Sequence, residues 1–191
     1  MANICSVTMY FFGEKNAVED LHAKCERWMN TGGKAAKLLS ALNINKEGLN
    51  LHCEACYVGE LFVGPTGDRT FGLDVDCAWD ATPAFDIFDR IILRDYVDQN
   101  GEPKIKYDWI AEELGCQIFE KHDEGGNCPE KYHLVVADDD YFTESDSELR
   151  DVMTDLFKRT FNGTEEIWQF IGDYADEHPD EYVSLREYVE C

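Results

Sequence analysis

The apolar residues of this chain follow two different spacings, and the change from one to the other limits the folds that the sequence can adopt. Within residues 49–63 and 70–77, apolar side chains recur at every second position, which is typical of strands with one buried face. After Ser145 they recur at intervals of three and four, which is typical of amphipathic helices. The expected order of elements is roughly β-α-β-β-α-α-β-β followed by helices. This order favours an α+β fold, with a mixed or antiparallel sheet and helices on one face.

Turn and capping residues give approximate bounds for these elements. We expect strands over about residues 4–12, 49–63 and 70–77, and a hairpin formed by residues 116–120 and 132–137. We expect helices over about 18–29, 34–42 and 82–94, around Trp109, Ile110 and Leu114, in two segments that begin near Ser145 and Thr164, and in a short segment from Pro179. The sequence thus predicts an α+β domain over residues 1–140 and an acidic helical extension over 141–191, packed on the same core.

The charge of the chain restricts its partners. Forty acidic and 17 basic side chains give a net charge of -23, and residues 138–191 alone carry 17 acidic and four basic side chains. A protein that binds nucleic acid directly needs lysine and arginine to displace the counterions of the phosphates. We therefore expect no direct binding to nucleic acid and none to an anionic membrane.

The chain has eight cysteines, whose oxidation state depends on the cellular compartment. The chain opens without a charged leader or an apolar run of signal-peptide length, and no stretch approaches 18 apolar residues. We therefore expect a cytoplasmic protein with reduced cysteines.

Two short motifs are candidates for enzyme chemistry. Cys53 and Cys56 form a C-x-x-C pair that could bind zinc or exchange thiols, but a second pair is missing and a regular strand would direct the two side chains to opposite faces. Asp74 and Asp76 could hold a cation, but they alternate with apolar residues as in a half-solvated strand. We expect no catalytic residues, no metal site and no cofactor.

Three passages resemble the Api-like proteins of plasmids and phages, which carry a ferredoxin-like domain. They are the opening Met1-Ala2-Asn3 before the first strand, the passage from Phe71 to Pro83 with Asp76-Cys77-Ala78-Trp79, and the segment from Gly115 to Asp138. The resemblance covers roughly residues 1–140, and the segment after Thr143 departs from it. It implies a ferredoxin-like sheet and an origin in a mobile element. It implies no catalytic residues, because the family has no assigned activity.

The acidic residues of the last third support a hypothesis about function. Carboxylates on neighbouring helices could imitate the phosphates of a nucleic acid, so the chain could inhibit a basic nucleic-acid-binding defence protein of the host, as an anti-CRISPR or anti-restriction protein. The candidate partner-binding residues are Asp138, Asp139, Asp140, Glu144, Asp146, Glu148, Asp151, Asp155, Glu165, Glu166, Asp173, Asp176 and Glu177. Two alternatives stay open: a regulatory or structural domain whose acidity serves only solubility, and a small metal- or thiol-dependent enzyme.

Overall fold

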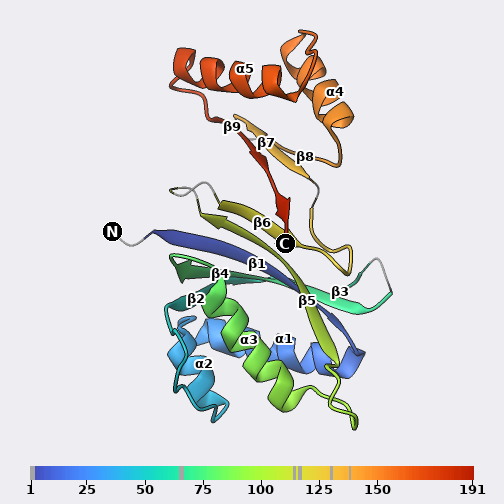
Figure 1. The fold of residues 1–191 in the computed structure, drawn as a ribbon. Coiled ribbons are helices and arrows are strands. Elements are labelled where there is room, and N and C mark those ends of the chain that lie inside the picture. The colour runs from blue at the N-terminus through green and yellow to red at the C-terminus, as the bar shows by residue number, and fades with distance from the viewer. Residues whose placement is uncertain (1–2, 65–66, 114, 116–117, 130, 138) are drawn as a thin grey trace. The chain divides into compact units, whose positions relative to one another are not determined.

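The structure is a computed structural model that describes residues 3–64, 67–113, 115, 118–129, 131–137 and 139–191. The predictions for Leu114, Cys116 and Asp138 fall outside these residues. The α+β class is confirmed, with five helices and two sheets in the part of the chain described (Figure 1). The chain divides into two compact units, residues 1–128 with 190–191 and residues 129–189. The division falls at Pro129, before the boundary that the sequence suggested at residue 140.

The first unit is built on a seven-stranded sheet. Its strands lie in the order β10-β6-β5-β1-β4-β2, and β3 also pairs with β4. The strand bounds are β1 (Ile4–Gly13), β2 (Cys53–Val58), β3 (Phe62–Val63), β4 (Arg69–Ala78), β5 (Ile105–Glu113), β6 (Ile118–His122) and β10 (Val189–Glu190). The long central strand β1 pairs antiparallel with both β4 and β5. The period-two segments of the sequence therefore form the sheet as expected, except that the segment 49–63 is divided into β2 and β3.

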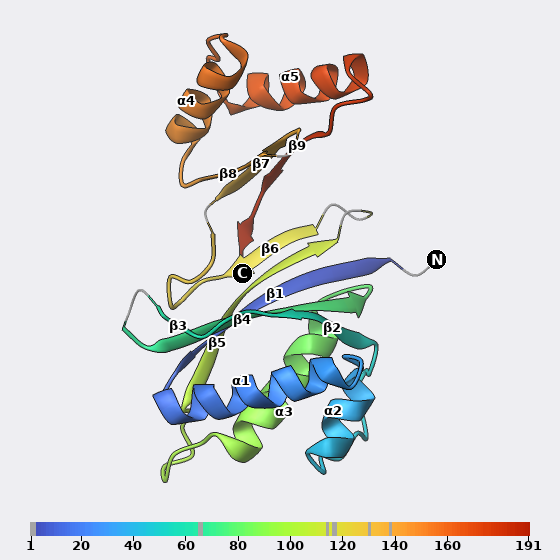
Figure 2. The ribbon, with the colours of Figure 1, turned by 180° about the vertical axis from the view of Figure 1, so that it is seen from behind.

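Three helices cover one face of this sheet. They are α1 (Lys15–Asn30), α2 (Ala35–Ala41) and α3 (Thr82–Asp95), and both views show them on the same side (Figures 1 and 2). Helix α1 buries Val18, Leu21, Cys25 and Trp28, which recur at intervals of three and four. Helix α3 has its N-cap at Ala81 and a proline in its first turn, and it begins at Thr82 as the sequence predicted.

An aromatic cluster occupies the centre of the first core. The ring of Phe11 on β1 lies 5.2 Å from that of Phe71 on β4 and 4.8 Å from that of Phe88 on α3. Trp28 of α1 approaches Phe88 at 6.1 Å. These contacts join helices and sheet into one apolar layer.

The helix expected around Trp109 is wrong, because residues 105–113 form β5. Adjacent residues of β5 point to opposite faces, and Trp109 and Ile110 pair with Met9 and Thr8 of β1. The expected hairpin between residues 116–120 and 132–137 is also wrong. Strand β6 pairs with β5, whereas the later segment pairs with strands of the second unit.

The second unit has two helices on a three-stranded sheet. Its elements are β7 (Tyr132–Val136), β8 (Asp139–Thr143), α4 (Asp146–Phe157), α5 (Thr164–Glu177) and β9 (Val183–Glu187), with strand order β8-β7-β9. Leu134, Leu149, Met153, Ile167 and Ile171 form the centre of a separate apolar core.

The short helix expected from Pro179 is wrong, because the segment that follows this proline forms the strand β9. Val183 and Leu185 alternate with more exposed residues, and they pair with Val136 and Leu134 of β7. The acidic C-terminal segment is therefore a mixture of helices and strands.

Candidate functional site

Helix α4 carries a row of carboxylates along one side. Its N-cap Ser145 accepts a hydrogen bond from the backbone N–H of Glu148, as expected for a capping box. The Glu148 carboxylate in turn accepts the backbone N–H of Glu144 at 2.8 Å. Glu148, Asp151 and Asp155 are exposed and stand three and four residues apart, so they lie on one side of the helix.

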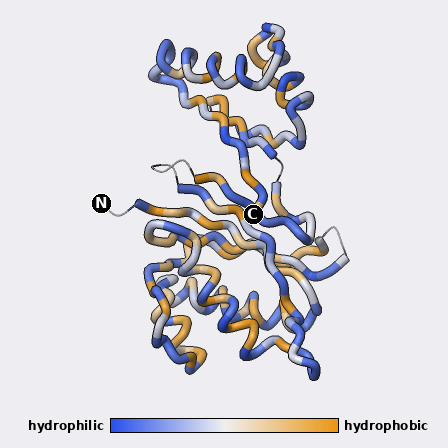
Figure 3. Tube along the Cα trace, viewed as in Figure 1, coloured by the Kyte–Doolittle hydropathy of each residue, from blue (hydrophilic) through white to orange (hydrophobic). Residues whose placement is uncertain are grey.

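Helix α5 directs carboxylates away from the core of the second unit. Ile167 and Ile171 are buried, and the side opposite them carries Glu165, Asp173 and Asp176, all exposed. Along both helices the hydropathy alternates with the helical turn (Figure 3). We call the six residues Glu148, Asp151, Asp155, Glu165, Asp173 and Asp176, three on the outward side of each helix, the acidic helical face.

Other predicted partner-binding residues have structural contacts within the second unit. Asp140 accepts a hydrogen bond from His133 Nε2 at 2.6 Å. Asp146 accepts one from the Tyr132 hydroxyl at 2.6 Å and pairs with Lys131 at 3.3 Å, and these two contacts lower its pKa.

Glu166 is held in the same way at the start of α5. It accepts hydrogen bonds from the backbone and side chain of Asn162 and pairs with Arg159 at 2.8 Å, and these contacts lower its pKa. Glu166, Asp140 and Asp146 therefore stabilise the fold and are less available to a partner.

The remaining predicted residues have no ion pair among the residues described. They are Asp139, Glu144, Glu148, Asp151, Asp155, Glu165, Asp173, Asp176 and Glu177. The second unit as a whole carries 17 acidic and five basic side chains, a net charge of -12 in 61 residues. The first unit carries -11 in 130 residues, so the charge is about twice as dense in the second unit.

The C-x-x-C motif does not bring its two cysteines together. Cys53 is buried on the helix side of β2, and Cys56 is exposed at a bulge. Cys53 instead lies opposite Cys77 of β4, which lies opposite Cys5 of β1, and all three thiols are free. Among the residues described, no group of three or more histidine, cysteine, aspartate or glutamate side chains could hold a metal ion.

The predicted acidic pair of β4 has a structural role. Asp74 accepts a hydrogen bond from the Thr8 hydroxyl at 2.8 Å, and Asp76 accepts one from the Ser6 hydroxyl at 3.0 Å. These bonds link β4 to β1 across the face that α1, α2 and α3 leave uncovered. Each carboxylate thus accepts a hydrogen bond from a neutral hydroxyl group, and these bonds have a structural role in the sheet.

The thiols are expected to react slowly in the native protein. Burial raises the pKa of Cys5 to about 12, and burial followed by a contact with Asp76 raises the pKa of the exposed Cys56 to about 11 from an ordinary value of 9.0. A raised pKa reduces the thiolate fraction at pH 8, and the greater nucleophilicity of each thiolate offsets only part of that loss. Alkylation of Cys56 by iodoacetamide, followed by peptide mass spectrometry, should be about tenfold slower than that of free cysteine. A native thiol that reacts faster than free cysteine would contradict this expectation and favour the thiol-enzyme alternative.

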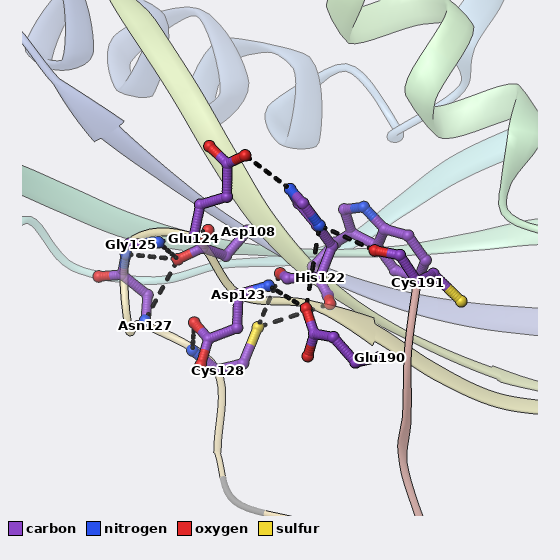
Figure 4. Close-up of polar contacts among 10 residues, drawn as sticks. Asp108, His122, Asp123, Glu124, Gly125, Asn127, Cys128, Glu190 and Cys191 are labelled. Carbon is purple, nitrogen blue, oxygen red and sulfur yellow. Dashed lines mark hydrogen bonds and ion pairs between the residues drawn. The ribbon is translucent and has the colours of Figure 1, made fainter.

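A buried carboxylate that the sequence did not point to organises the loop after β6. Asp108 is 0% exposed, and its two oxygens accept hydrogen bonds from the backbone N–H of Gly125 at 3.0 and 3.1 Å. One of them also accepts the backbone N–H of Asn127 at 3.2 Å and its side-chain amide at 2.7 Å (Figure 4). The only signal in the sequence was one aspartate within an apolar strand. The arrangement closes the loop and leaves this carboxylate no capacity for a ligand.

Comparisons with known proteins give no match. Neither protein-family models, nor characterised proteins, nor solved structures give a match. In the described part of the chain, no helix combines the length and apolar character needed to cross a membrane. The function of this chain is therefore inferred from its own charges and contacts.

Proposed function

We propose that this chain is a non-enzymatic acidic interaction protein that inhibits a basic nucleic-acid-binding protein by presenting carboxylates in place of phosphates. The observation that supports it best is the acidic helical face. All six side chains are exposed, and none of them forms an ion pair among the residues described, although the Glu148 carboxylate also accepts the backbone N–H of Glu144. Residues three and four apart on a helix stand about 5–6 Å from each other. Carboxylates at this spacing can contact the lysine and arginine side chains with which a basic partner binds the phosphates of a nucleic acid.

The class of the partner follows from the same charges. A surface this acidic attracts lysine- and arginine-rich proteins and repels nucleic acids. We assign the partner to the host defence effectors and nucleases, in the manner of an anti-CRISPR or anti-restriction protein, and the setting to the cytoplasm. A ferredoxin-like arrangement of the first unit and an origin in a mobile element belong to the same proposal.

An exposed aromatic residue adds to the suitability of α5 as a contact surface. Trp168 is 40% exposed and follows the buried Ile167 on α5, in the stretch of the helix between Glu165 and Asp173. Tryptophan is enriched among the residues that dominate binding energy at protein interfaces. We include this indole in the proposed contact surface.

Two variants with equal change of charge test the proposal. In the first, Asp151, Asp155, Asp173 and Asp176 are replaced by asparagine, which removes four exposed carboxylates from the acidic helical face. In the control, Asp86→Asn, Glu47→Gln, Glu60→Gln and Glu102→Gln remove four exposed carboxylates from the first unit. Both should remain folded, because surface substitutions away from caps and ion pairs change stability by only about 0.5 kcal/mol each.

The readout is retention of basic nucleic-acid-binding proteins from a nuclease-treated host lysate, followed by affinity measurement for the protein retained. We expect the first variant to lose about tenfold or more in affinity at low salt, and the control to lose much less. Equal losses in the two variants would show that net charge alone is responsible. Retention that changes neither with the salt concentration nor with the substitutions would contradict the proposal.

A further inference from the structure

A groove on the first unit combines aromatic rings with carboxylates. It encloses about 430 Å³ between α3 and the strands β5 and β6. Asp89 and Leu93 of α3, Tyr107 and Trp109 of β5, and His122 and Glu124 are among its lining residues. A volume of this size suits a small ligand or a single large side chain.

The wall formed by β5 is aromatic. Tyr107 and Trp109 are two residues apart, so their side chains lie on the same face of the strand. Phe85 of α3 packs behind them, with ring centroids 6.1 Å from Tyr107 and 4.7 Å from Trp109. Tyr107 and Trp109 are partly buried and line the groove, with the ring of Phe11 5.7 Å from that of Tyr107 and the ring of His122 6.4 Å from that of Trp109. The negative face of such a ring attracts a cation that lies within about 6 Å of its centre.

The wall formed by α3 carries an uncompensated negative charge. Asp89 is exposed, accepts a hydrogen bond from the Tyr107 hydroxyl at 2.7 Å, and has no ion pair among the residues described. Burial and this hydrogen bond raise the pKa of Tyr107 above its ordinary value. The phenol therefore stays neutral, and the negative charge of this pair lies on Asp89. Beside Asp89, Leu93 is 61% exposed and leaves an apolar side chain open to solvent.

The third side of the groove carries His122 and Glu124. His122 on β6 has Glu124 at 3.9 Å from Nε2 and Glu190 at 3.9 Å from Nδ1, one on each side of its ring (Figure 4). Lys106 pairs with Glu124 at 3.6 Å, and its side chain is largely exposed at the rim. Among the lining residues one lysine thus stands against two carboxylates, Asp89 and Glu124, and a cation that entered the groove would find aromatic rings and negative charge together.

We propose that this groove binds the guanidinium group of an arginine side chain from a partner protein. The guanidinium group is planar, so it can stack on Tyr107 or Trp109 while its N–H groups point to Asp89. A lysine ammonium is more strongly hydrated and lacks the planar face, so it binds less well. Anions are repelled by the carboxylates. The groove and the acidic helical face belong to different units, so each is tested with its own variants and either can fail without the other.

The test uses the full chain, labelled with ¹⁵N, and two capped amino acids as probes. N-acetyl-arginine amide carries the guanidinium group, and N-acetyl-citrulline amide has nearly the same shape without the charge. The readout is the indole N–H signal of Trp109, identified by its loss in Trp109→Phe and distinguished from the signals of Trp28, Trp79 and Trp168. We expect the arginine probe to shift this signal with millimolar affinity, and the citrulline probe to bind about two- to fivefold more weakly or not at all.

Substitution of the carboxylate gives a second criterion. Asp89→Asn keeps an acceptor for the Tyr107 hydroxyl and removes the charge, and it should weaken binding of the arginine probe about threefold. Glu60→Gln makes the same change of charge in the segment after β2, at the other edge of the sheet, and should leave binding unchanged. The inference is overturned if both probes shift Trp109 equally, if Trp109 does not respond, or if Asp89→Asn and Glu60→Gln bind alike.

Discussion

Replacing Ile167 by alanine is expected to unfold the second unit and to leave the first unit folded. Ile167 is 0% exposed at the centre of a core that is separate from that of the first unit. Truncation of a fully buried isoleucine costs about 2–5 kcal/mol. A unit of 61 residues has a stability of only about 3–9 kcal/mol by the usual value per residue. The loss is therefore large enough to populate the unfolded form of this unit.

Hydrogen exchange measured by mass spectrometry checks this result, because it reports each segment separately. Protection should fall in β7, α4 and α5 and persist in β1, β4 and α3. Gln169→Ala, an exposed position on the same helix, should change stability by no more than about 0.5 kcal/mol. Loss of protection across both units in the Ile167 variant would show that they fold as one, against the expectation from their separate cores.

Replacing Asp108 by alanine is expected to cost about 3 kcal/mol or more. The change leaves the buried N–H of Gly125 and the N–H groups of Asn127 without an acceptor, and each buried orphan donor costs about 1–3 kcal/mol. Chemical denaturation followed through the near-UV signal of the first unit measures the effect. Lys106→Ala, at an exposed position of the same strand, is the control and should change stability by at most about 1 kcal/mol, because its ion pair with Glu124 is exposed.

A substitution on the other side of the same contact gives an independent check. A Cβ at Gly125 would lie 2.7 Å from Asp108 Oδ2, 2.6 Å from Asn127 Nδ2 and 2.7 Å from the Phe12 ring. Gly125→Ala should therefore also destabilise the first unit, by about 1–3 kcal/mol. Wild-type stability in both variants would mean that the loop after β6 does not depend on the Asp108 carboxylate.

Local spacing predicted most elements of the fold correctly, and long-range pairing explains the errors. The alternation in residues 70–77 gave β4, and the apolar spacing behind Ser145 gave α4, because each pattern is complete within one segment. Residues 105–113 were mistaken for a helix because Trp109, Ile110 and Leu114 fit a helical spacing. Their strand conformation is imposed by pairing with β1, about 100 residues earlier in the sequence. Similarly, β7 pairs with β9 across 47 or more residues, which no local pattern could reveal.

The candidate sites show the same limit. The opposite orientations of Cys53 and Cys56 followed from strand alternation, and the structure confirms them. The acidity of the last third was visible in the sequence, but which carboxylates are held by Lys131, His133 and Arg159 depends on tertiary contacts. The Asp108 contacts and the groove beside α3 join segments that are distant in sequence, so sequence alone gave no indication of them.

The central claim is that carboxylates of α4 and α5 occupy the surface on which a basic partner binds nucleic acid. The most direct measurement is competition: duplex DNA is titrated into the complex of this chain with the protein that it retains, at constant ionic strength. We predict that DNA displaces the chain stoichiometrically from its partner, because both compete for the same lysine and arginine side chains. A complex that keeps this chain bound while the partner also binds DNA would contradict the claim.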